Sequence, residues 1–244
     1  MQKWVLKIAI LGAVLLVFSP VLSQDANQYL KRADSLYNQR KFSEAKDIYQ
    51  SLYRQGYSSP ATLLKMAQAY EGLDQTSQAL FFLTSYYYQS EDQRAYDKIQ
   101  VIANAKNLSG YELSDFERLM IWLSNRADFI LIALFTASTL SVIGMIYFRM
   151  KGSYSGKLAT GILALFFASI LFVIINFLMF PDKAVIIKPA YVMSGPSAGA
   201  SFIELVSEGN SVTVESEKDI WVLAKWNGKE GYIRKSDLLI GRYN

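Results

Sequence analysis

The sequence contains neither cysteine nor histidine. Without cysteine there is no disulfide, no thiol nucleophile and no thiolate ligand for a metal ion. Without histidine the chain lacks the commonest general base and the commonest ligand of transition metals. Catalytic triads of the Ser-His-Asp and Cys-His kinds are therefore excluded.

Other signatures of catalysis are also missing from the sequence. It has no glycine-rich loop of the phosphate-binding kind, and its carboxylates are spread over segments of mixed charge. We therefore expect no catalytic residue, no cofactor site and no metal site, and we interpret the chain as a protein that is not an enzyme.

The charge distribution argues for a membrane and against a nucleic acid. A net charge of +4 and an isoelectric point near 9 would suit nucleic-acid binding. However, residues 24–127 contain 12 basic and 12 acidic residues, and residues 181–244 contain 8 of each. The remaining charges lie at the ends of hydrophobic segments: Lys3, Lys7, Arg149, Lys151 and Lys157, against Asp128. This is the positive-inside pattern of a membrane protein.

The first hydrophobic segment, residues 1–23, has the features of a secretory signal peptide. Two lysines precede an apolar run, and small or apolar residues end it at Val21-Leu22-Ser23. The alternative is an uncleaved N-terminal anchor. Either interpretation puts the following residues outside the cytoplasm.

Residues 129–148 and 158–180 are two long stretches without a charged side chain. Each is long enough to cross a hydrocarbon core of ~30 Å as a helix. The short segment between them, residues 149–157, contains Arg149, Lys151 and Lys157 and no acid, which indicates a cytoplasmic loop. We therefore expect both soluble parts on the extracytoplasmic side of the membrane.

Small residues recur at intervals of four within both spans, which favours close packing of the two helices into a hairpin. They are Ala133, Ala137 and Ser141, then Ala164 and Ala168. The alternative is that small residues are simply common in such helices. A two-span channel subunit is a weaker hypothesis, because the spans contain no charge and Asn176 is their one strongly polar side chain.

Residues 24–111 repeat their pattern of small and large residues at an offset of 34. Ala33 and Ala45 fall on Ala67 and Ala79, and large apolar or aromatic residues fall on one another. This period resembles that of tetratricopeptide (TPR) repeats, each a pair of antiparallel helices. The resemblance implies that the four alanines lie where helices cross, and that the stacked repeats form a concave surface for a peptide or partner protein.

The stretch "SYYYQ", residues 85–89, places three tyrosines together. Tyrosine is enriched at protein interfaces, which makes Tyr87 and Tyr88 candidate interaction residues. The alternative is that Tyr86 is a core residue and that its neighbours pack on the next helix.

Residues 112–148 are expected to form one helix that enters the membrane without interruption. Ser114 and Glu117 have the spacing of a capping box, which predicts where this helix begins. No glycine or proline follows before the span at residues 129–148. The soluble repeats would then be coupled rigidly to the membrane.

Residues 184–244 have the short alternating runs and turn residues of an all-β domain. Asn227-Gly228 is a favoured two-residue hairpin turn. The segments "YVMSGPSAGASFIELVSEGNSVTV" and "WVLAKWNGKEGYIRKSDL" resemble the strands and turns of bacterial SH3-like (SH3b) domains, which implies a small barrel. In that family arginine commonly stands where this chain has Met193, so a charged binding contact of the family cannot be assigned to this position. Four aromatic residues are candidates for a binding face: Tyr191, Trp221, Trp226 and Tyr232.

The fold class we expect is a multidomain membrane protein: an all-α TPR-like repeat, a transmembrane hairpin and a small all-β SH3-like barrel. This order resembles the BatE-type TPR proteins of bacterial aerotolerance (Bat) operons. The resemblance implies a protein of the bacterial inner (cytoplasmic) membrane with periplasmic domains. It also implies a complex with other Bat proteins, some with von Willebrand factor A domains, and a role in oxidative or envelope stress tolerance. The hypothesis is a periplasmic scaffold for protein–protein interaction. The alternative is a membrane protein that binds peptidoglycan through its SH3-like domain.

Overall fold

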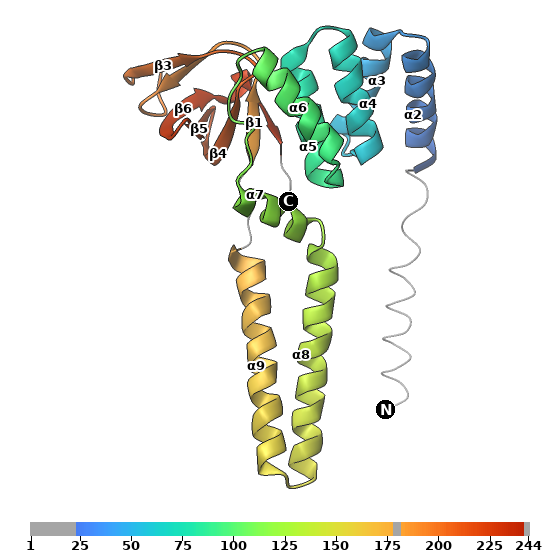
Figure 1. Ribbon diagram of the computed structural model, residues 1–244, viewed down its shortest axis with the longest axis vertical. Coiled ribbons are helices and arrows are strands. Elements are labelled where there is room, and N and C mark those ends of the chain that lie inside the picture. Colours follow the sequence, from blue (N-terminus) through green and yellow to red (C-terminus); the bar gives the residue numbers. More distant parts are fainter. Residues whose placement is uncertain (1–22, 178–181, 242–244) are drawn as a thin grey trace. The chain divides into compact units, whose positions relative to one another are not determined.

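The computed structural model describes residues 23–177 and 182–241 (Figure 1). The predicted signal peptide lies outside the described residues except for Ser23. The chain divides into two compact units, residues 1–83 and residues 84–244, and the division falls within one helix. Each unit is described by itself below.

The first unit is helical, and its helices recur with the offset expected from the sequence. Helices α2 and α4 end at Asn38 and Gly72, and helices α3 and α5 begin at Phe42 and Thr76, so both pairs of boundaries keep that offset. The bounds are α2 Ser23–Asn38, α3 Phe42–Arg54, α4 Pro60–Gly72 and α5 Thr76–Ser90, and α5 continues into the second unit. The unit is therefore built from two helix pairs with matching boundaries.

The turns inside the two pairs also match. Arg40 and Asp74, which are related by the same offset, have left-handed backbones with φ of 61° and 58°. After each of them the chain returns a hydrogen bond to the preceding helix, Lys41 N to Leu36 O at 3.0 Å and Gln75 N to Tyr70 O at 2.9 Å. These bonds satisfy carbonyl groups at the end of each first helix.

The four alanines predicted at helix crossings are buried. Ala33 and Ala45 are fully inaccessible to solvent, and Ala67 and Ala79 are nearly so. Aromatic rings also pack within this unit, as where Tyr70 stacks on Phe82 with ring centroids 5.3 Å apart. A role for these alanines in helix packing is consistent with their burial.

The second unit continues with α6 Gln93–Ala105 and α7 Asp115–Ser124. The capping box is present: Ser114 Oγ accepts a hydrogen bond from Glu117 N at 3.2 Å, and Ser114 N donates to Glu117 Oε2 at 2.9 Å. Helix α7 therefore begins where the Ser114–Glu117 spacing places its start.

The prediction of one uninterrupted helix into the membrane span was wrong. Helix α7 ends at Ser124, and α8, Ala127–Met150, begins after a two-residue turn. Tertiary hydrogen bonds hold the turn: Asn125 Nδ2 donates to Tyr88 O at 2.9 Å, and Arg126 Nη1 donates to Glu91 Oε1 at 2.7 Å. Polar groups of the preceding helical region therefore end α7 where no glycine or proline does.

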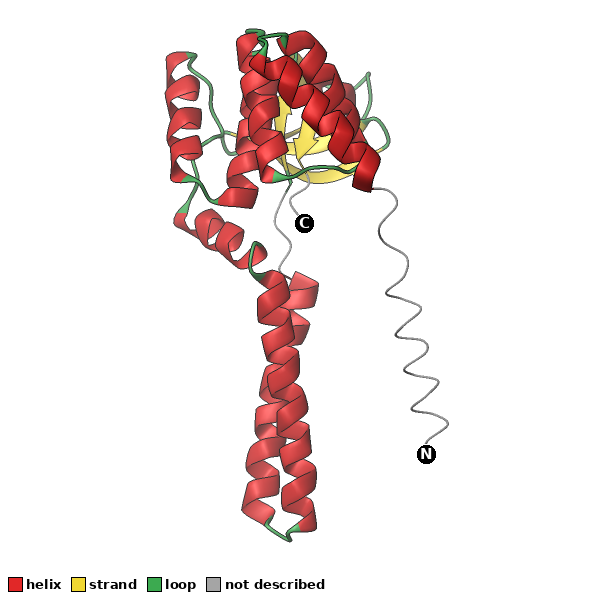
Figure 2. Cartoon of the chain, turned by 90° about the vertical axis from the view of Figure 1, so that its right-hand side faces the viewer, coloured by secondary structure: helices red, strands yellow, loops and turns green. Residues whose placement is uncertain are grey.

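Helices α8 and α9, Tyr154–Phe177, pack along each other as an antiparallel hairpin (Figure 2). Both are long and apolar enough to cross a membrane. The contact is closest near Gly144, whose α-carbon faces Thr160, and near Gly156, which faces Phe148. Ser141 is buried as expected, whereas Ala133 and Ala168 are exposed. The chain turns at residues 151–153, a shorter loop than the segment 149–157 anticipated from the sequence.

The rest of the second unit is a seven-stranded antiparallel sheet in the order β3-β2-β6-β5-β4-β1-β7. The strands are β1 Lys183–Ile186, β2 Ala190–Met193, β3 Phe202–Val206, β4 Ser211–Lys218, β5 Trp221–Trp226, β6 Lys229–Arg234 and β7 Leu238–Gly241, with a short 3-10 helix at Lys235–Asp237. Asn227 and Gly228 both have positive φ and join β5 to β6, as the hairpin prediction requires.

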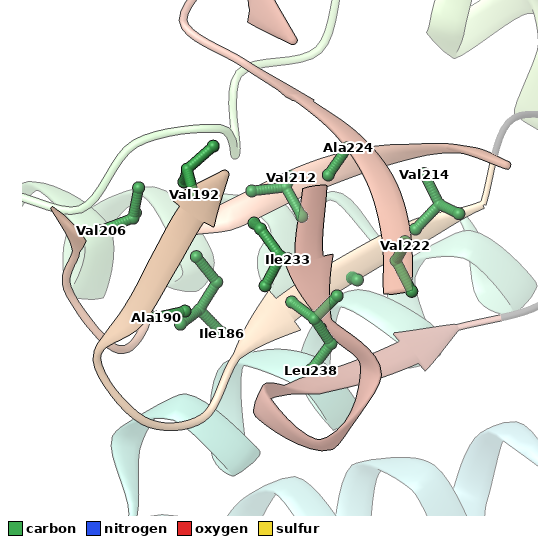
Figure 3. Close-up of a cluster of buried hydrophobic side chains, with 11 residues drawn as sticks. Ile186, Ala190, Val192, Val206, Val212, Val214, Val222, Ala224, Ile233 and Leu238 are labelled. Atoms are coloured by element: carbon green, nitrogen blue, oxygen red, sulfur yellow. The ribbon is translucent and has the colours of Figure 1, made fainter. Parts of the chain in front are cut away.

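The sheet has a core of small and branched aliphatic side chains, drawn in Figure 3. Ile186, Val206 and Ile233 are at most 1% exposed. This core contains none of the four aromatic residues singled out above, although Trp226 packs against it.

The loop between α6 and α7 is bonded to the β3–β4 turn, and we call this the loop–sheet contact (residues 108–111 against residues 209–211). Asn210 Oδ1 accepts hydrogen bonds from Ser109 N at 2.8 Å and Ser109 Oγ at 3.0 Å. Tyr111 donates its hydroxyl hydrogen to Gly209 O at 2.5 Å. Gly110 has φ of 89°, and a β-carbon there would overlap Ser211 O. The contact joins segments that are far apart in the sequence.

Candidate functional site

A cavity opens on the sheet, and we call it the β-groove. Its volume is about 600 Å³. It is lined by β2, β3, the first residue of β5, the last of β6 and the neighbouring loops: Lys188, Pro189, Tyr191, Met193, Ala198, Phe202, Trp221, Arg234, Ser236 and Asp237.

Strand alternation in β2 places one aromatic ring on the groove side. Ala190 and Val192 point into the core, so Tyr191 between them points outward and is 63% exposed. Phe202 of β3 pairs with Met193 and is 58% exposed. The rings of Tyr191 and Phe202 meet edge-to-face with centroids 5.9 Å apart. An exposed aromatic pair on one sheet face is the kind of surface that anchors a partner.

A cation and a buried indole form another part of the lining. Trp221 is only 7% exposed, and it pairs across the strands with Arg234. The Arg234 guanidinium lies 5.6 Å from the centroid of the Trp221 ring, a cation–π distance. No acidic side chain is bonded to Arg234 among the residues that the structure describes, so its donors are open to a ligand.

An ion pair borders the same cavity. Lys188 Nζ lies 2.9 Å from Asp237 Oδ1, and the lysine is more exposed than the carboxylate. The β-groove therefore combines exposed aromatic rings with one cation held over an indole and one cation paired with a carboxylate. This arrangement can hold an extended ligand through apolar contacts and fix its orientation through hydrogen bonds.

The four predicted aromatic residues of the sheet divide between two places. Tyr191 and Trp221 line the β-groove. Trp226 belongs beside the loop–sheet contact, where its Nε1 donates a hydrogen bond to Ser109 Oγ at 2.8 Å. Tyr232 is half-buried in β6, opposite Met193 and Leu223. Tyr232 shares the outer face of the sheet with Tyr191, but neither it nor Trp226 lines the β-groove.

Tyr87 and Tyr88 are not surface residues in the structure. They are 6% and 5% exposed, and the Tyr87 ring lies 5.2 Å from that of Tyr96 on α6. Burial raises the pKa of Tyr87. Tyr87 and Tyr88, the candidate interaction residues of the helical region, are therefore buried among the described residues and form no exposed surface there. Packing on the next helix, the alternative interpretation, describes them better.

Sequence reasoning missed Phe202, Lys188, Arg234 and Asp237 as groove residues. A signal for Phe202 was present, because "FIEL" in β3 does not alternate between apolar and polar residues. Phe202, Ile203 and Leu205 are all exposed, and β3 is at one end of the strand order. Apolar residues exposed along an edge strand are a sign of a pairing or docking surface. The charged residues gave no such signal.

The three basic residues used to assign topology gather at one end of the hairpin. Arg149 lies in the last turn of α8, Lys151 lies in the connecting turn, and Lys157 lies in the first turn of α9. The Lys157 ammonium is 5.2 Å from the centroid of the Tyr154 ring.

Within residues 23–177 and 182–241 no group of three or more Asp and Glu residues is arranged to hold a metal ion. No protein-family model, no curated protein and no solved structure matches the chain.

Proposed function

We propose that the protein is a membrane-anchored scaffold for protein–protein interaction, which holds an extended segment of a partner protein in the β-groove. The observation that carries this proposal is the exposed Tyr191–Phe202 pair beside a cavity of about 600 Å³. The two helices that are apolar enough to cross a membrane supply the anchor. Exposed aromatic residues rarely lie together on a soluble surface that has no partner.

The proposal includes the finer identities suggested by the sequence. The two helix pairs with matching boundaries support TPR-like repeats, and the small sheet with a glycine-containing hairpin supports an SH3-like domain. Their order along the chain supports a BatE-type protein that works with other Bat proteins in oxidative or envelope stress tolerance. Von Willebrand factor A-type membrane proteins are the partners that this resemblance implies.

The proposed location is the bacterial inner membrane, with the helical repeats and the sheet in the periplasm. Arg149, Lys151 and Lys157 at one end of the hairpin support a cytoplasmic turn there. A reporter enzyme active only in the periplasm should work when fused after residue 110 or at residue 244. It should fail when inserted within residues 151–153, and the opposite result would reverse the topology.

Photo-crosslinking in cells tests the scaffold proposal directly. A photoreactive phenylalanine analogue replaces Phe202, and the control is Lys218, which is also exposed but does not line the β-groove. Adducts with proteins encoded in the same operon, formed from position 202 and not from 218, support the proposal. No protein adduct from 202, in cells that express those neighbours, would count against it.

Cell-wall binding through the sheet is the second candidate. The exposed faces of Tyr191 and Phe202 also favour it, because aromatic rings stack on sugar rings. The full-length protein in detergent should then sediment with purified sacculi, and Tyr191→Ala should abolish sedimentation. Trp226→Ala should leave it intact, because that indole faces Ser109 instead. If the photo-crosslinks formed at position 202 are released by muramidase, which digests peptidoglycan, the ligand is the cell wall and not a partner protein.

A further inference from the structure

Helix α7 presents an apolar face that the described residues leave uncovered. Phe116 is 68% exposed, Leu119 is 51% exposed and Trp122 is 45% exposed. Steps of three along a helix place these side chains on one face. For a helix of 10 residues this is a large exposed apolar area. Helix α7 belongs neither to the β-groove nor to the two helix pairs of the first unit, so the face needs an explanation of its own.

The opposite face of α7 is fixed to the rest of the unit, so the helix cannot roll to hide its apolar side. Met120 and Ile121 are buried. Glu117 makes an ion pair of 2.9 Å with the nearly buried Lys183 of β1. The Arg118 guanidinium lies 4.8 Å from the centroid of the Tyr96 ring on α6. The polar and buried contacts therefore hold the apolar face outward.

The chain connection places this face close to the start of an apolar helix. Helix α8 begins at Ala127, after the two residues that follow α7, and α8 is one of the helices long and apolar enough to cross a membrane. Figure 1 shows the chain turning between the two helices. Arg126, in the turn, lies 4.7 Å from the centroid of the Trp122 ring. Tryptophan and arginine are residues favoured where a membrane meets water.

We infer that α7 is an interfacial helix, which lies on the membrane with Phe116, Leu119 and Trp122 at the boundary between headgroups and acyl chains. The occupant of this face is the lipid surface, because α7 is continuous with a span that begins just after it. The inference rests on the proposed membrane anchoring. The inference also explains the turn at Asn125 and Arg126. If α7 continued straight into α8, its apolar face would extend away from the membrane.

Charge on α7 is compatible with this position. Asp115, Glu117 and Arg118 are its ionisable residues, and two of them are engaged by Lys183 and Tyr96 on the side away from the apolar face. The remaining one, Asp115, is on the same side as Leu119, but it lies in the first turn, where a carboxylate interacts favourably with the helix dipole. Glu117 and Arg118 therefore leave the face of Leu119 and Trp122 apolar along most of the helix, which suits an interface.

The absence of cysteine makes a direct test possible, because any introduced cysteine is unique. Full-length L119C protein is labelled with a nitroxide and reconstituted in vesicles of phosphatidylcholine and phosphatidylglycerol. Collision rates with oxygen, which concentrates in lipid, and with a water-soluble nickel chelate are then compared by electron paramagnetic resonance. V101C on α6 is the control in water, and F135C within α8 is the control in lipid, with exposed fractions of 67% and 65%.

The expected ratio of oxygen to nickel collisions at position 119 is higher than at 101 and lower than at 135. Across a cysteine scan of residues 115–123 the ratio should peak at 116, 119 and 122. A ratio at 119 equal to that at 101 would overturn the inference, since the face would then be in water. Protection from both reagents would also overturn it, because a second copy or another protein would then cover the face.

The same data separate this inference from the proposed anchoring. If the label at 135 is as accessible to nickel as the label at 101, the hairpin is outside the bilayer, and both the anchoring and the interfacial helix fail. If 135 is in lipid while 119 is in water, only the interfacial helix fails. The three positions compared are exposed, so these substitutions preserve the packed core.

Discussion

Tyr49 of the helical repeats and Tyr191 of the sheet are the same residue type in elements that each have a buried and an exposed side. Tyr49 is fully buried and donates a hydrogen bond to Asp34 Oδ1 at 2.6 Å, whereas Tyr191 is 63% exposed and touches Phe202. The difference comes from the neighbouring elements. Packed helices cover the first ring, whereas strand alternation turns the second away from a core of small aliphatic residues.

The comparison extends to the other aromatic residues of the two regions. Those of the helical region are largely structural: Tyr70 and Phe82 stack, and Tyr87 packs beside Tyr96. The sheet fills its core without aromatic rings and leaves Tyr191 and Phe202 outside. A cluster of tyrosines in the sequence is therefore a poor sign of a binding site when its helix is packed against others. A single tyrosine between two core residues of a strand is a better sign of a binding site, because strand alternation turns its side chain outward.

The strongest test of this contrast is the same substitution in both regions. Tyr49→Ala should lower the free energy of unfolding by about 3–5 kcal/mol, because it empties a packed site and leaves Asp34 without its hydroxyl partner. Tyr191→Ala should change it by less than about 0.5 kcal/mol. Chemical denaturation followed by circular dichroism in detergent measures both. Similar losses of unfolding free energy for the two variants would mean that the two tyrosines do not differ in structural role.

Glycine in a left-handed turn offers a second pair of variants. Gly56, after α3, and Gly110, in the loop–sheet contact, have φ of 88° and 89°. A β-carbon at Gly56 meets open space, so Gly56→Ala should cost only the backbone strain, roughly 1–2 kcal/mol. At Gly110 it would overlap Ser211 O, and the loop would have to leave the sheet.

Gly110→Ala should therefore cost about 2–4 kcal/mol, more than the matched change at Gly56. Limited proteolysis should in addition cut the loop at residues 106–113 faster in this variant. Equal losses of stability at the two glycines would mean that the loop–sheet contact contributes little to the fold of its unit.

The ion pair between α7 and β1 predicts a pH dependence. Burial alone would raise the pKa of Glu117, but its bonds to Lys183 and Ser114 outweigh burial and hold the pKa below the usual value of a glutamate. A carboxyl with a lowered folded pKa adds stability above its unfolded pKa, and this stability is lost as the pH falls through the folded value. The second unit should therefore lose stability below about pH 4.5.

Glu117→Gln keeps a capping-box residue but leaves the Lys183 ammonium without its counter-charge, which should cost about 1.5–3 kcal/mol at pH 7. The same variant should flatten the acid limb of the stability profile. Glu204→Gln is the matched control, since its pair with Lys229 is exposed and should contribute less than about 1 kcal/mol. An unchanged acid limb in Glu117→Gln would assign the pH dependence to other carboxylates.

Much of this architecture was predictable because it depends on residue spacings within short segments of the sequence. The repeat offset located the helix pairs, Ser114 and Glu117 located the start of α7, and Asn227-Gly228 located the turn between β5 and β6. The sequence did not predict the end of α7, because hydrogen bonds from Asn125 to Tyr88 and Glu91 cause it. Contacts between residues so far apart in the chain leave no periodic signal.

The candidate site was predictable only in part, for a related reason. Tyr191 and Trp221 were identified from residue type, but the position of Trp226 depends on Ser109, far earlier in the chain. Arg234 joins the β-groove because strand pairing sets it across from Trp221, a register that turn lengths and bulges determine together. Which aromatic residues share a face is therefore a property of the folded sheet.

The smallest expected effect isolates the polar part of the buried tyrosine. Tyr49→Phe retains the ring and removes the hydroxyl that donates to Asp34, while Asp34 keeps its ion pair with Lys65 at 2.6 Å. Burial, followed by the bond to Asp34, raises the pKa of the Tyr49 phenol, so the hydroxyl stays protonated and donating at any physiological pH. The substitution should cost about 0.5–1.5 kcal/mol, the net value of one hydrogen bond. Tyr191→Phe, measured in the same denaturation series, should cost nothing detectable, and a loss there equal to that at Tyr49 would mean that the Tyr191 hydroxyl also has a structural role.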